Sequence, residues 1–274
     1  MLTMIIFVLS VLKSEKLIFF LLLMTISDAN PVQFWLSECA TYNEQEPFGI
    51  HRRCFCAPWE TDDEIKVQFT DDGTTEYDLV VFNEDDEEIH SEPFEISDTK
   101  YSASLLLDAI SPDVSGKIQL KIIEVSSPEV IIAKSDCLEI GDHEGSVLIR
   151  YANPRNYAGL VYDETSPDTD FYLRVPAMFY HTRQVSEDEF LSLTNQIVMQ
   201  NNEIKDQRLF TTDSLPEYFH KKIQLVLKHQ TVEIDNMYWM KEEAYEQLET
   251  DRRNPLKKYS VWLTDKDSIQ RNVL

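Results

Sequence analysis

The sequence has few glycines and few basic residues. It contains 6 glycines in 274 residues, and neither G-x-G-x-x-G nor G-x-x-x-x-G-K-[ST] occurs, so nucleotide binding through these two phosphate loops is excluded. Lys and Arg number 25 against 49 Asp and Glu, which gives a formal net charge of −24. Nucleic acids and anionic membranes are bound largely through Lys and Arg. The composition therefore predicts protein partners and no nucleic acid.

Long apolar runs are also lacking. The runs Met4–Leu12 and Leu17–Ile26 are separated by a charged break, and neither reaches the roughly 20 residues that cross a bilayer. We therefore expect no stable membrane span. Residues 1–29 are interpreted as a leader outside the fold. They are either a false start upstream of a true start at Met24, which we favour, or a signal peptide cleaved after Ser27–Ala29, which would export the protein.

The cysteines are too few for a disulfide-stapled miniprotein of this length. They are Cys39, Cys54, Cys56 and Cys137. We expect reduced thiols in the core, as in a cytoplasmic protein. A disulfide is one alternative. The other is a zinc site that adds His51, although the C-x-C spacing lacks the usual C-x(2–4)-C pair.

Acidic residues concentrate in the middle of the chain. Residues 61–145 hold 23 Asp or Glu against 5 Lys, a net −18. Short runs of alternating apolar and polar residues fill this stretch, and Lys117–Val125 with Val130–Ile140 is predicted to form a hairpin. Several strands at this spacing predict an antiparallel, immunoglobulin-like β-sandwich over residues 30–145.

The acidic turns are interpreted as solvated turns. Asp71–Thr74 contains an Asp-Gly step and is predicted to join Ile65–Thr70 to Tyr77–Asn83 as a hairpin. Neither this turn nor Glu84–Glu88 has the D-x-[DN]-x-[DN]-G order of a calcium loop. We therefore expect no metal and no cofactor.

The second half of the chain, residues 146–274, is predicted to be α+β. Phe171–Tyr180 is a long apolar strand, and Thr231–Met240 forms a hairpin around Asp-Asn. Two capping boxes, Ser186–Glu189 and Ser214–Glu217, precede apolar residues at helical spacing. They predict two helices, the second ending near His229. The fold class is thus mainly β to α+β.

No pattern of catalytic residues is present. None of the six histidines belongs to a metal-ligand spacing, and G-x-S-x-G does not occur. His220 and His229, near several Lys, are interpreted as part of a polar helix face. We therefore expect no enzymatic activity. The interaction candidates are large aromatics and one basic pair, namely Arg52, Arg53, Trp59, Phe179, Tyr180, Tyr238 and Trp239.

Several segments follow one another in a recognisable order, namely Cys56–Asp63, Ile65–Phe69, Ala133–Ile140, Ile149–Asn153, Phe171–Pro176 and Arg208–Trp239. This order resembles uncharacterised structural proteins of tailed phages and prophages of Bacteroidetes-type bacteria. The resemblance covers about residues 30–270 and contains no chemical motif.

This resemblance implies a non-enzymatic virion protein of the tail or baseplate, assembled in the host cytoplasm. Its partners would be other virion proteins and copies of itself. The alternative is an exported surface protein whose immunoglobulin-like domains bind a partner. The first protein would begin near Met24 and the second at Asn30.

Overall fold

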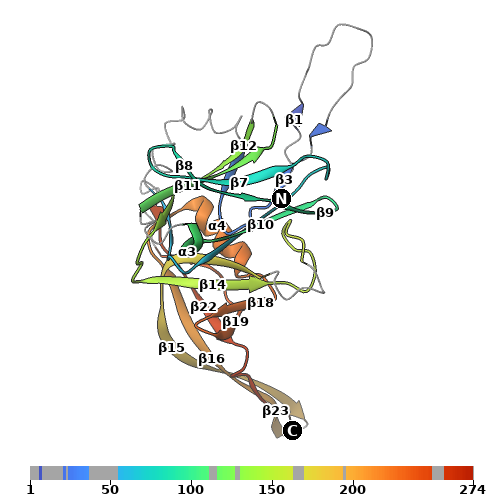
Figure 1. Ribbon diagram of the computed structural model, residues 1–274. Coiled ribbons are helices and arrows are strands. Elements are labelled where there is room, and N and C mark those ends of the chain that lie inside the picture. The colour runs from blue at the N-terminus through green and yellow to red at the C-terminus, as the bar shows by residue number, and fades with distance from the viewer. Residues whose placement is uncertain are drawn as a thin grey trace. The chain divides into compact units, whose positions relative to one another are not determined.

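The computed structural model describes residues 6–7, 21–22, 24–36, 55–110, 116–126, 130–162, 170–193, 196–248 and 256–273. These residues are mainly β and form several sheets (Figure 1). The chain divides into two compact units. Unit 1 consists of Met1–Asp142 and Pro154–Tyr172, and unit 2 consists of His143–Asn153 and Leu173–Leu274.

Unit 1 contains two larger sheets. The first is antiparallel and has the order β3-β6-β10-β9. Its strands are β3 (Thr25–Ile26), β6 (Glu64–Thr70), β10 (Lys100–Leu106) and β9 (Glu95–Ser97). The second has the order β4-β12-β11-β13-β5, and β7 joins β11 to β8. Its strands are β4 (Phe34–Leu36), β12 (Val130–Ser135), β11 (Gly116–Glu124), β13 (Leu138–Ile140), β5 (Ala57–Trp59), β7 (Tyr77–Phe82) and β8 (Glu88–Pro93). The short elements β1 (Ile6–Phe7), β2 (Leu21–Leu22) and helix α3 (Leu107–Ile110) complete the described part.

Aromatic rings join the two sheets of unit 1. Phe69 of β6 and Tyr101 of β10 stack with their centroids 4.8 Å apart. Tyr77 of β7, in the other sheet, contacts both rings edge-on at 5.3 and 5.2 Å. All three rings are buried, and such stacked and edge-on pairs add to the stabilisation from apolar burial. The core of unit 1 therefore lies between these sheets.

The predicted hairpin around Asp71–Thr74 is wrong in its pairing. Both strands form, but β6 pairs with β3 and β10, whereas β7 pairs with β8 and β11. The turn therefore crosses from one sheet to the other. Gly73 adopts a φ of +80°, and a Cβ there would lie 2.3 Å from the carbonyl oxygen of Asp98. Only glycine tolerates both conditions.

Residues 25–29 belong to the fold, so the leader expected over residues 1–29 is wrong for this part. Strand β3 pairs with β6 through Thr25 and Ile26. Ser27 and Ala29 are buried. Asn30 exchanges hydrogen bonds with the backbone of Gln68, at 2.7 and 2.8 Å. These bonds satisfy a buried amide, which would otherwise be costly.

Unit 2 is built on a closed ring of six strands. Each strand pairs with the next in the order β14-β18-β19-β22-β16-β15, and β15 returns to β14. The strands are β14 (Ser146–Ala152), β18 (Thr231–Ile234), β19 (Met237–Lys241), β22 (Tyr259–Asp265), β16 (Gln196–Thr212) and β15 (Phe171–Leu193). The predicted hairpin Thr231–Met240 is confirmed by β18 and β19. Four short strands complete the described part of the unit: β17 (Leu215–Pro216), β20 (Glu246–Gln247), β21 (Leu256–Lys257) and β23 (Gln270–Val273).

One of the two predicted helices of this half is wrong. Ser186–Glu189 lies inside β15, where each of these residues has a partner on β16. Long-range strand pairing therefore overrides the local helix signal. The second helix forms as α4 (Glu217–Val226), with Phe219, Ile223 and Val226 buried as predicted. Its N-cap is Pro216 and not Ser214, and no side chain caps it.

Candidate interaction surface

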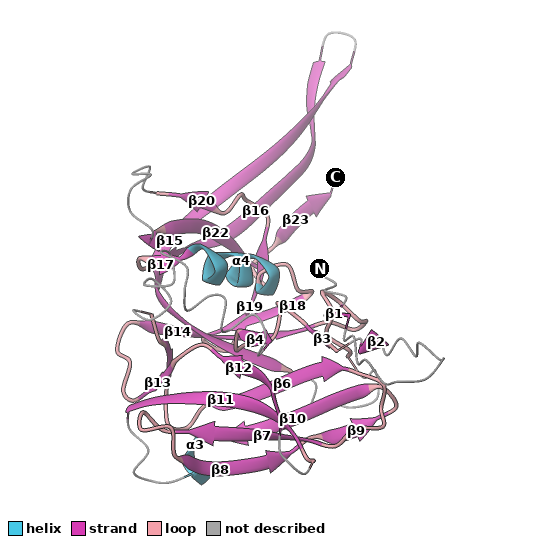
Figure 2. Ribbon diagram, turned by 90° about the horizontal axis from the view of Figure 1, so that it is seen from above, coloured by secondary structure: helices cyan, strands magenta, loops and turns pink. Residues whose placement is uncertain are grey.

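The most prominent feature of unit 2 is a long β-ribbon, shown in Figure 2. β15 has 23 residues and β16 has 17, but β22 pairs with β16 only between Gln207 and Thr211. Beyond this point the two long strands continue as a hairpin, to which the short strand β23 (Gln270–Val273) adds. We call Thr182–Leu193 of β15, Gln196–Asp206 of β16 and β23 together the arm. The arm extends away from the ring that carries it.

A β-bulge marks the point where the arm begins. Phe179 pairs with Phe210, and the next pair is Thr182 with Arg208. Tyr180 and His181 on β15 thus stand opposite a single residue of β16. A bulge of this kind twists the strand and re-aims its side chains. Tyr180 is 56% exposed, with its ring centroid 4.2 Å from that of His181.

A polar network ties the base of the arm to the ring. Gln207 of β16 accepts a hydrogen bond from Arg183 Nε (2.8 Å) and donates to Thr264 Oγ1 (3.1 Å). Thr264 in turn donates to Glu242 (2.9 Å). Gln207 and Thr264 are both buried. These bonds link β15, β16, β22 and the segment after β19, and they fix the direction in which the arm leaves the ring.

Lys205 lies at the centre of this network. Its ammonium is 3.1 Å from Glu242, 3.4 Å from Glu187 and 3.7 Å from Glu203, and its side chain is 8% exposed. Burial acts to lower the pKa of Lys205. The hydrogen bonds and charges of Glu242 and Glu187 outweigh burial, so the pKa lies above its ordinary value. Three carboxylates around one ammonium leave the base of the arm negatively charged.

Arg183 adds a second anchor at the same place. Its guanidinium stacks on the Trp262 ring of β22, 4.0 Å from the centroid, and forms an ion pair with Glu243. The aromatic face and the carboxylate already hold the guanidinium in place. The Arg183 side chain would therefore lose little conformational freedom when a partner binds near it.

The sequence candidates divide into three groups. Trp59 and Trp239 are buried and belong to the cores, and Trp239 Nε1 donates to the carbonyl of Ile234 (3.2 Å). Phe179 packs edge-on against Trp239 at 4.8 Å. The two tryptophans thus offer little surface to a partner, whereas Phe179 is half-buried with the Arg208 guanidinium 4.9 Å from its ring centroid and stays a prediction. Tyr180 and Tyr238 are exposed, at 56% and 42%. Arg52 and Arg53 lie outside the described residues.

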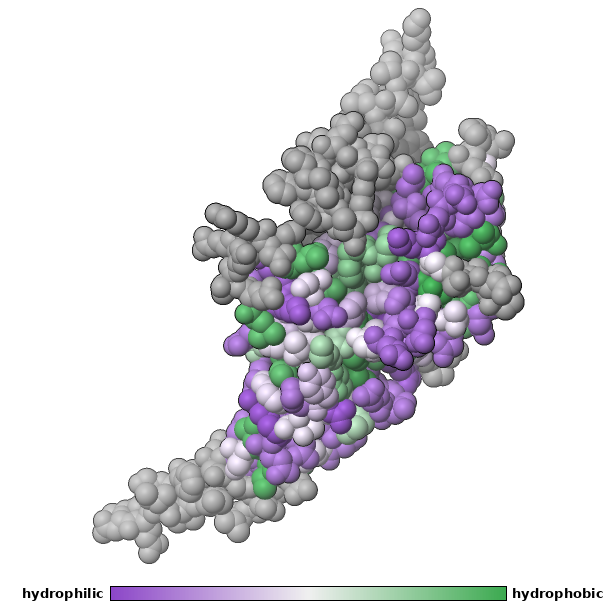
Figure 3. Space-filling view, turned by 90° about the vertical axis from the view of Figure 1, so that its left-hand side faces the viewer, coloured by the Kyte–Doolittle hydropathy of each residue, from purple (hydrophilic) through white to green (hydrophobic). Residues whose placement is uncertain are grey.

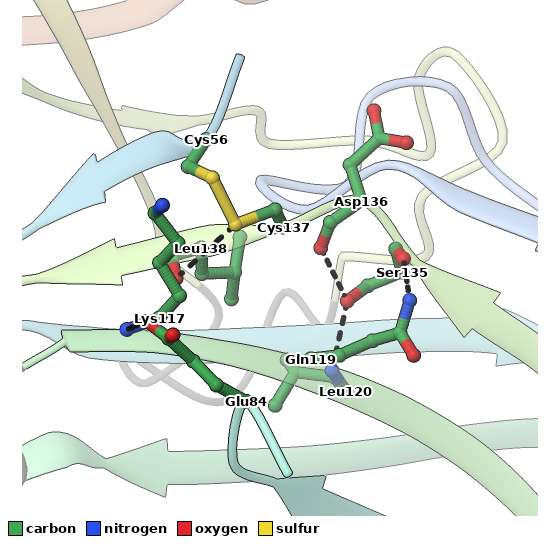
Figure 4. The surroundings of a disulfide bond; sticks show 9 residues. All are labelled: Cys56, Glu84, Lys117, Gln119, Leu120, Ser135, Asp136, Cys137 and Leu138. Atoms are coloured by element: carbon green, nitrogen blue, oxygen red, sulfur yellow. Dashed lines mark hydrogen bonds between the residues drawn. A yellow bond between two sulfur atoms is a disulfide. The ribbon is translucent and has the colours of Figure 1, made fainter. Parts of the chain in front are cut away.

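Two of the four cysteines form a disulfide, so the expectation of four reduced thiols is wrong. Cys56 and Cys137 are bonded and their Cα atoms are 4.5 Å apart (Figure 4). Each directly precedes a strand of the parallel pair β5 and β13, and Ala57 N donates to the Cys137 carbonyl (2.9 Å). The pairing of these strands brings the sulfur atoms together. Cys39, Cys54 and His51 lie outside the described residues.

His220 and His229 are not on a polar surface, and that prediction is wrong. Both are buried. His220 Nε2 donates to the Lys257 carbonyl (2.7 Å), and Nδ1 accepts from Tyr245 (2.9 Å). Burial lowers the pKa of both imidazoles, more strongly than their backbone hydrogen bonds raise it. His220 thereby ties α4 to the chain around β21.

Over the described ranges, no group of three or more His, Cys, Asp or Glu is placed to hold a metal ion. In the same part of the chain, no helix has both the length and the apolar character needed to cross a membrane. Comparison with known proteins finds no matching family model, no matching curated protein and no matching solved structure.

Proposed function

We propose that the protein is a non-enzymatic structural component of a phage particle, in the tail or baseplate, which acts through protein–protein contacts. The arm is the observation that carries this proposal. Beyond its pairing with β23 the arm is a two-stranded hairpin, and such a hairpin on its own is at best marginally stable in water. The arm gains stability when another protein covers it.

The surface character supports this reading. Residues 61–145 carry a net −18, and on the face in Figure 3 hydrophilic residues cover much of the described surface, with hydrophobic residues between them. Met178 and Tyr180, on alternate positions of β15, are 47% and 56% exposed. Aromatic and Met side chains are enriched in protein interfaces. Partners are therefore proteins, with no nucleic acid among them.

We also propose that unit 1 is an immunoglobulin-like sandwich. Its support is the pair of sheets joined by Phe69, Tyr77 and Tyr101. One difference stands out, because the disulfide of antibody domains connects the two sheets. Here Cys56 and Cys137 connect neighbouring strands of one sheet.

Mass spectrometry of purified particles from an induced lysogen tests the main proposal. The chain should co-purify with particles at a constant ratio to the known tail proteins. Particles from a strain in which this gene is deleted should lack a tail structure or fail to form. Intact, infective particles without the chain would refute the proposal.

A second candidate, an exported surface binding protein, is favoured by the disulfide, because disulfides persist mainly in oxidising compartments. N-terminal sequencing separates the two. The particle protein should begin at Met24 or Thr25, and the exported protein at Asn30. Cleavage before Asn30 would remove β3 from its sheet, so the exported form should also lose stability relative to a chain that keeps Thr25.

A further inference from the structure

The strands at the base of the arm have a buried inner face and a partly exposed outer face. Phe210 of β16 and Val261 of β22 pair with each other and are buried inside the ring. Side chains alternate between the two faces along a strand, so the next pair, Leu209 with Trp262, lies on the outer face. Both residues of this pair are partly exposed. The outer face therefore presents an apolar and an aromatic side chain at this level.

β15 adds exposed side chains to the same face. Met178 and Tyr180 are 47% and 56% exposed, whereas the ring of Phe179 between them turns inward and contacts Trp239. The bulge sets Tyr180 and the exposed His181 opposite a single residue, Leu209. We call the side chains of these three strands the aromatic face, which consists of Met178, Tyr180, His181, Leu209 and Trp262.

Arg183 holds the aromatic face in place from its arm side. Its guanidinium lies 4.0 Å from the centroid of the Trp262 ring, and Gln207 and Glu243 bind the same guanidinium. Trp, Tyr and Arg are the residue types that contribute most of the binding energy in protein interfaces. Because these contacts exist within the chain itself, little ordering remains to be done when a partner binds.

The exposed charge beside the aromatic face is mainly negative. The side chains of Glu187, Glu242 and Glu243 are 60%, 31% and 42% exposed. Lys205, which lies among these carboxylates, is 8% exposed, and Arg183 is already paired with Glu243. A partner that approaches this surface therefore meets carboxylates more than cations, and positive charge on the partner is favoured.

We propose that the aromatic face binds a basic segment of another protein, in which Arg or Lys residues alternate with apolar ones. A cation of the segment lies over the Tyr180 ring, where the π-electrons attract it, and pairs with the neighbouring carboxylates. The apolar residues of the segment cover Met178 and Leu209. A second copy of this chain is disfavoured as the occupant, because both copies would carry a net charge of −24 and repel each other.

Two synthetic heptapeptides test the proposal with the full chain. In one, Leu alternates with Arg, and in the other, Leu alternates with Glu; both carry a fluorescent label for anisotropy titration. The Arg peptide should bind, more weakly as the salt concentration rises, and the Glu peptide should not bind. Tyr180→Ser should weaken binding of the Arg peptide about fivefold or more. Tyr180→Phe should retain it, because a phenyl ring still attracts a cation.

The matched control is Tyr238→Ser. Tyr238 is a second exposed tyrosine, at 42%, on β19, which is two strands further round the ring from β16. This variant should bind the Arg peptide like the wild type, which separates binding at the aromatic face from general attraction to an acidic chain.

Circular dichroism checks that each variant is folded. Met178→Lys places a positive charge on the aromatic face, should also weaken binding of the Arg peptide, and tests the face independently if Tyr180→Ser does not fold. The proposal would be overturned if the Arg peptide does not bind, if both peptides bind equally, or if Tyr180→Ser binds as tightly as Tyr238→Ser.

This inference rests on the proposed contact-making role, but the two fail separately. A chain that is present in particles and does not bind the Arg peptide would end the basic-segment proposal and leave the particle role intact. A chain that binds the peptide through Tyr180 and is absent from particles would do the reverse.

Discussion

Removal of the Cys56–Cys137 disulfide should lower the free energy of unfolding of unit 1 substantially. The bonded residues are 81 apart in the sequence. For a loop of this length the chain-entropy model gives about 4.5 kcal/mol at 25 °C, and measured effects are typically about 2–4 kcal/mol. A local effect adds to this, because β5 has three residues and, in the described part of the chain, pairs with β13 alone. Without the bond, β5 and its buried Trp59 are held by a short parallel pair.

Urea unfolding followed by tryptophan fluorescence measures the effect, with and without reductant. The variant Cys56→Ala with Cys137→Ala is the control, since it should match the reduced wild type and ignore reductant. Thiol titration of denatured wild-type protein without reductant should find at most two free groups. An unchanged urea midpoint on reduction, or four titratable thiols, would refute the reasoning.

Three further predictions concern unit 2. Lys205→Met leaves three carboxylates without their ammonium and should lower the free energy of unfolding in urea by about 1–3 kcal/mol. The control Lys221→Met, at an exposed ion pair, should change it by less than about 0.5 kcal/mol. Equal losses in both variants would contradict the role given to the Lys205 network. Burial depresses the pKa of His220 and His229, so the unfolded state binds more protons and stability should fall as the pH drops below about 6.5; a flat profile between pH 7.5 and 5.5 would contradict this. Ser214→Ala should change stability little, because Pro216 is the N-cap, and a loss near the roughly 1 kcal/mol of a true cap would show otherwise.

Local signals predicted the turns well and the pairing of strands less well. Asp235 and Asn236 both adopt positive φ, as the Asp-Asn step between β18 and β19 requires. Gly73 also adopts positive φ, yet its strands enter different sheets. A turn signal fixes a reversal of the chain and does not specify whether the two strands pair with each other.

The arm could not be predicted from its sequence. Leu193 pairs with Gln196 across Thr194-Asn195, which is not one of the Asn-Gly or Asp-Gly steps that mark two-residue hairpins. The apparent capping box at Ser186 indicated a helix instead. The preference for strand arises from β16 and β23, which are distant partners that a short sequence window does not contain.

The disulfide was equally hidden, for a different reason. The separation of Cys56 and Cys137 in the sequence matches no usual disulfide or metal-ligand spacing, and the sequence does not determine how four cysteines are connected. Their proximity follows from the parallel pairing of β5 with β13, a contact that needs the whole sheet. The buried apolar residues of α4, by contrast, were predicted from their helical spacing.

The division of the chain into interleaved units has a consequence for its synthesis. Unit 1 contains Pro154–Tyr172, which follows the first segment of unit 2. Gln68 of β6 bonds to both backbone groups of Val161, at 2.6 and 3.1 Å, and Ser27 donates to the carbonyl of Ala158 at 2.5 Å. Domains usually fold in turn as they leave the ribosome. Here unit 1 cannot be completed until residue 172 has left the ribosome, although synthesis of unit 2 has begun by then. The sheets of unit 1 stay incomplete during this interval, in which a chaperone can bind the nascent chain.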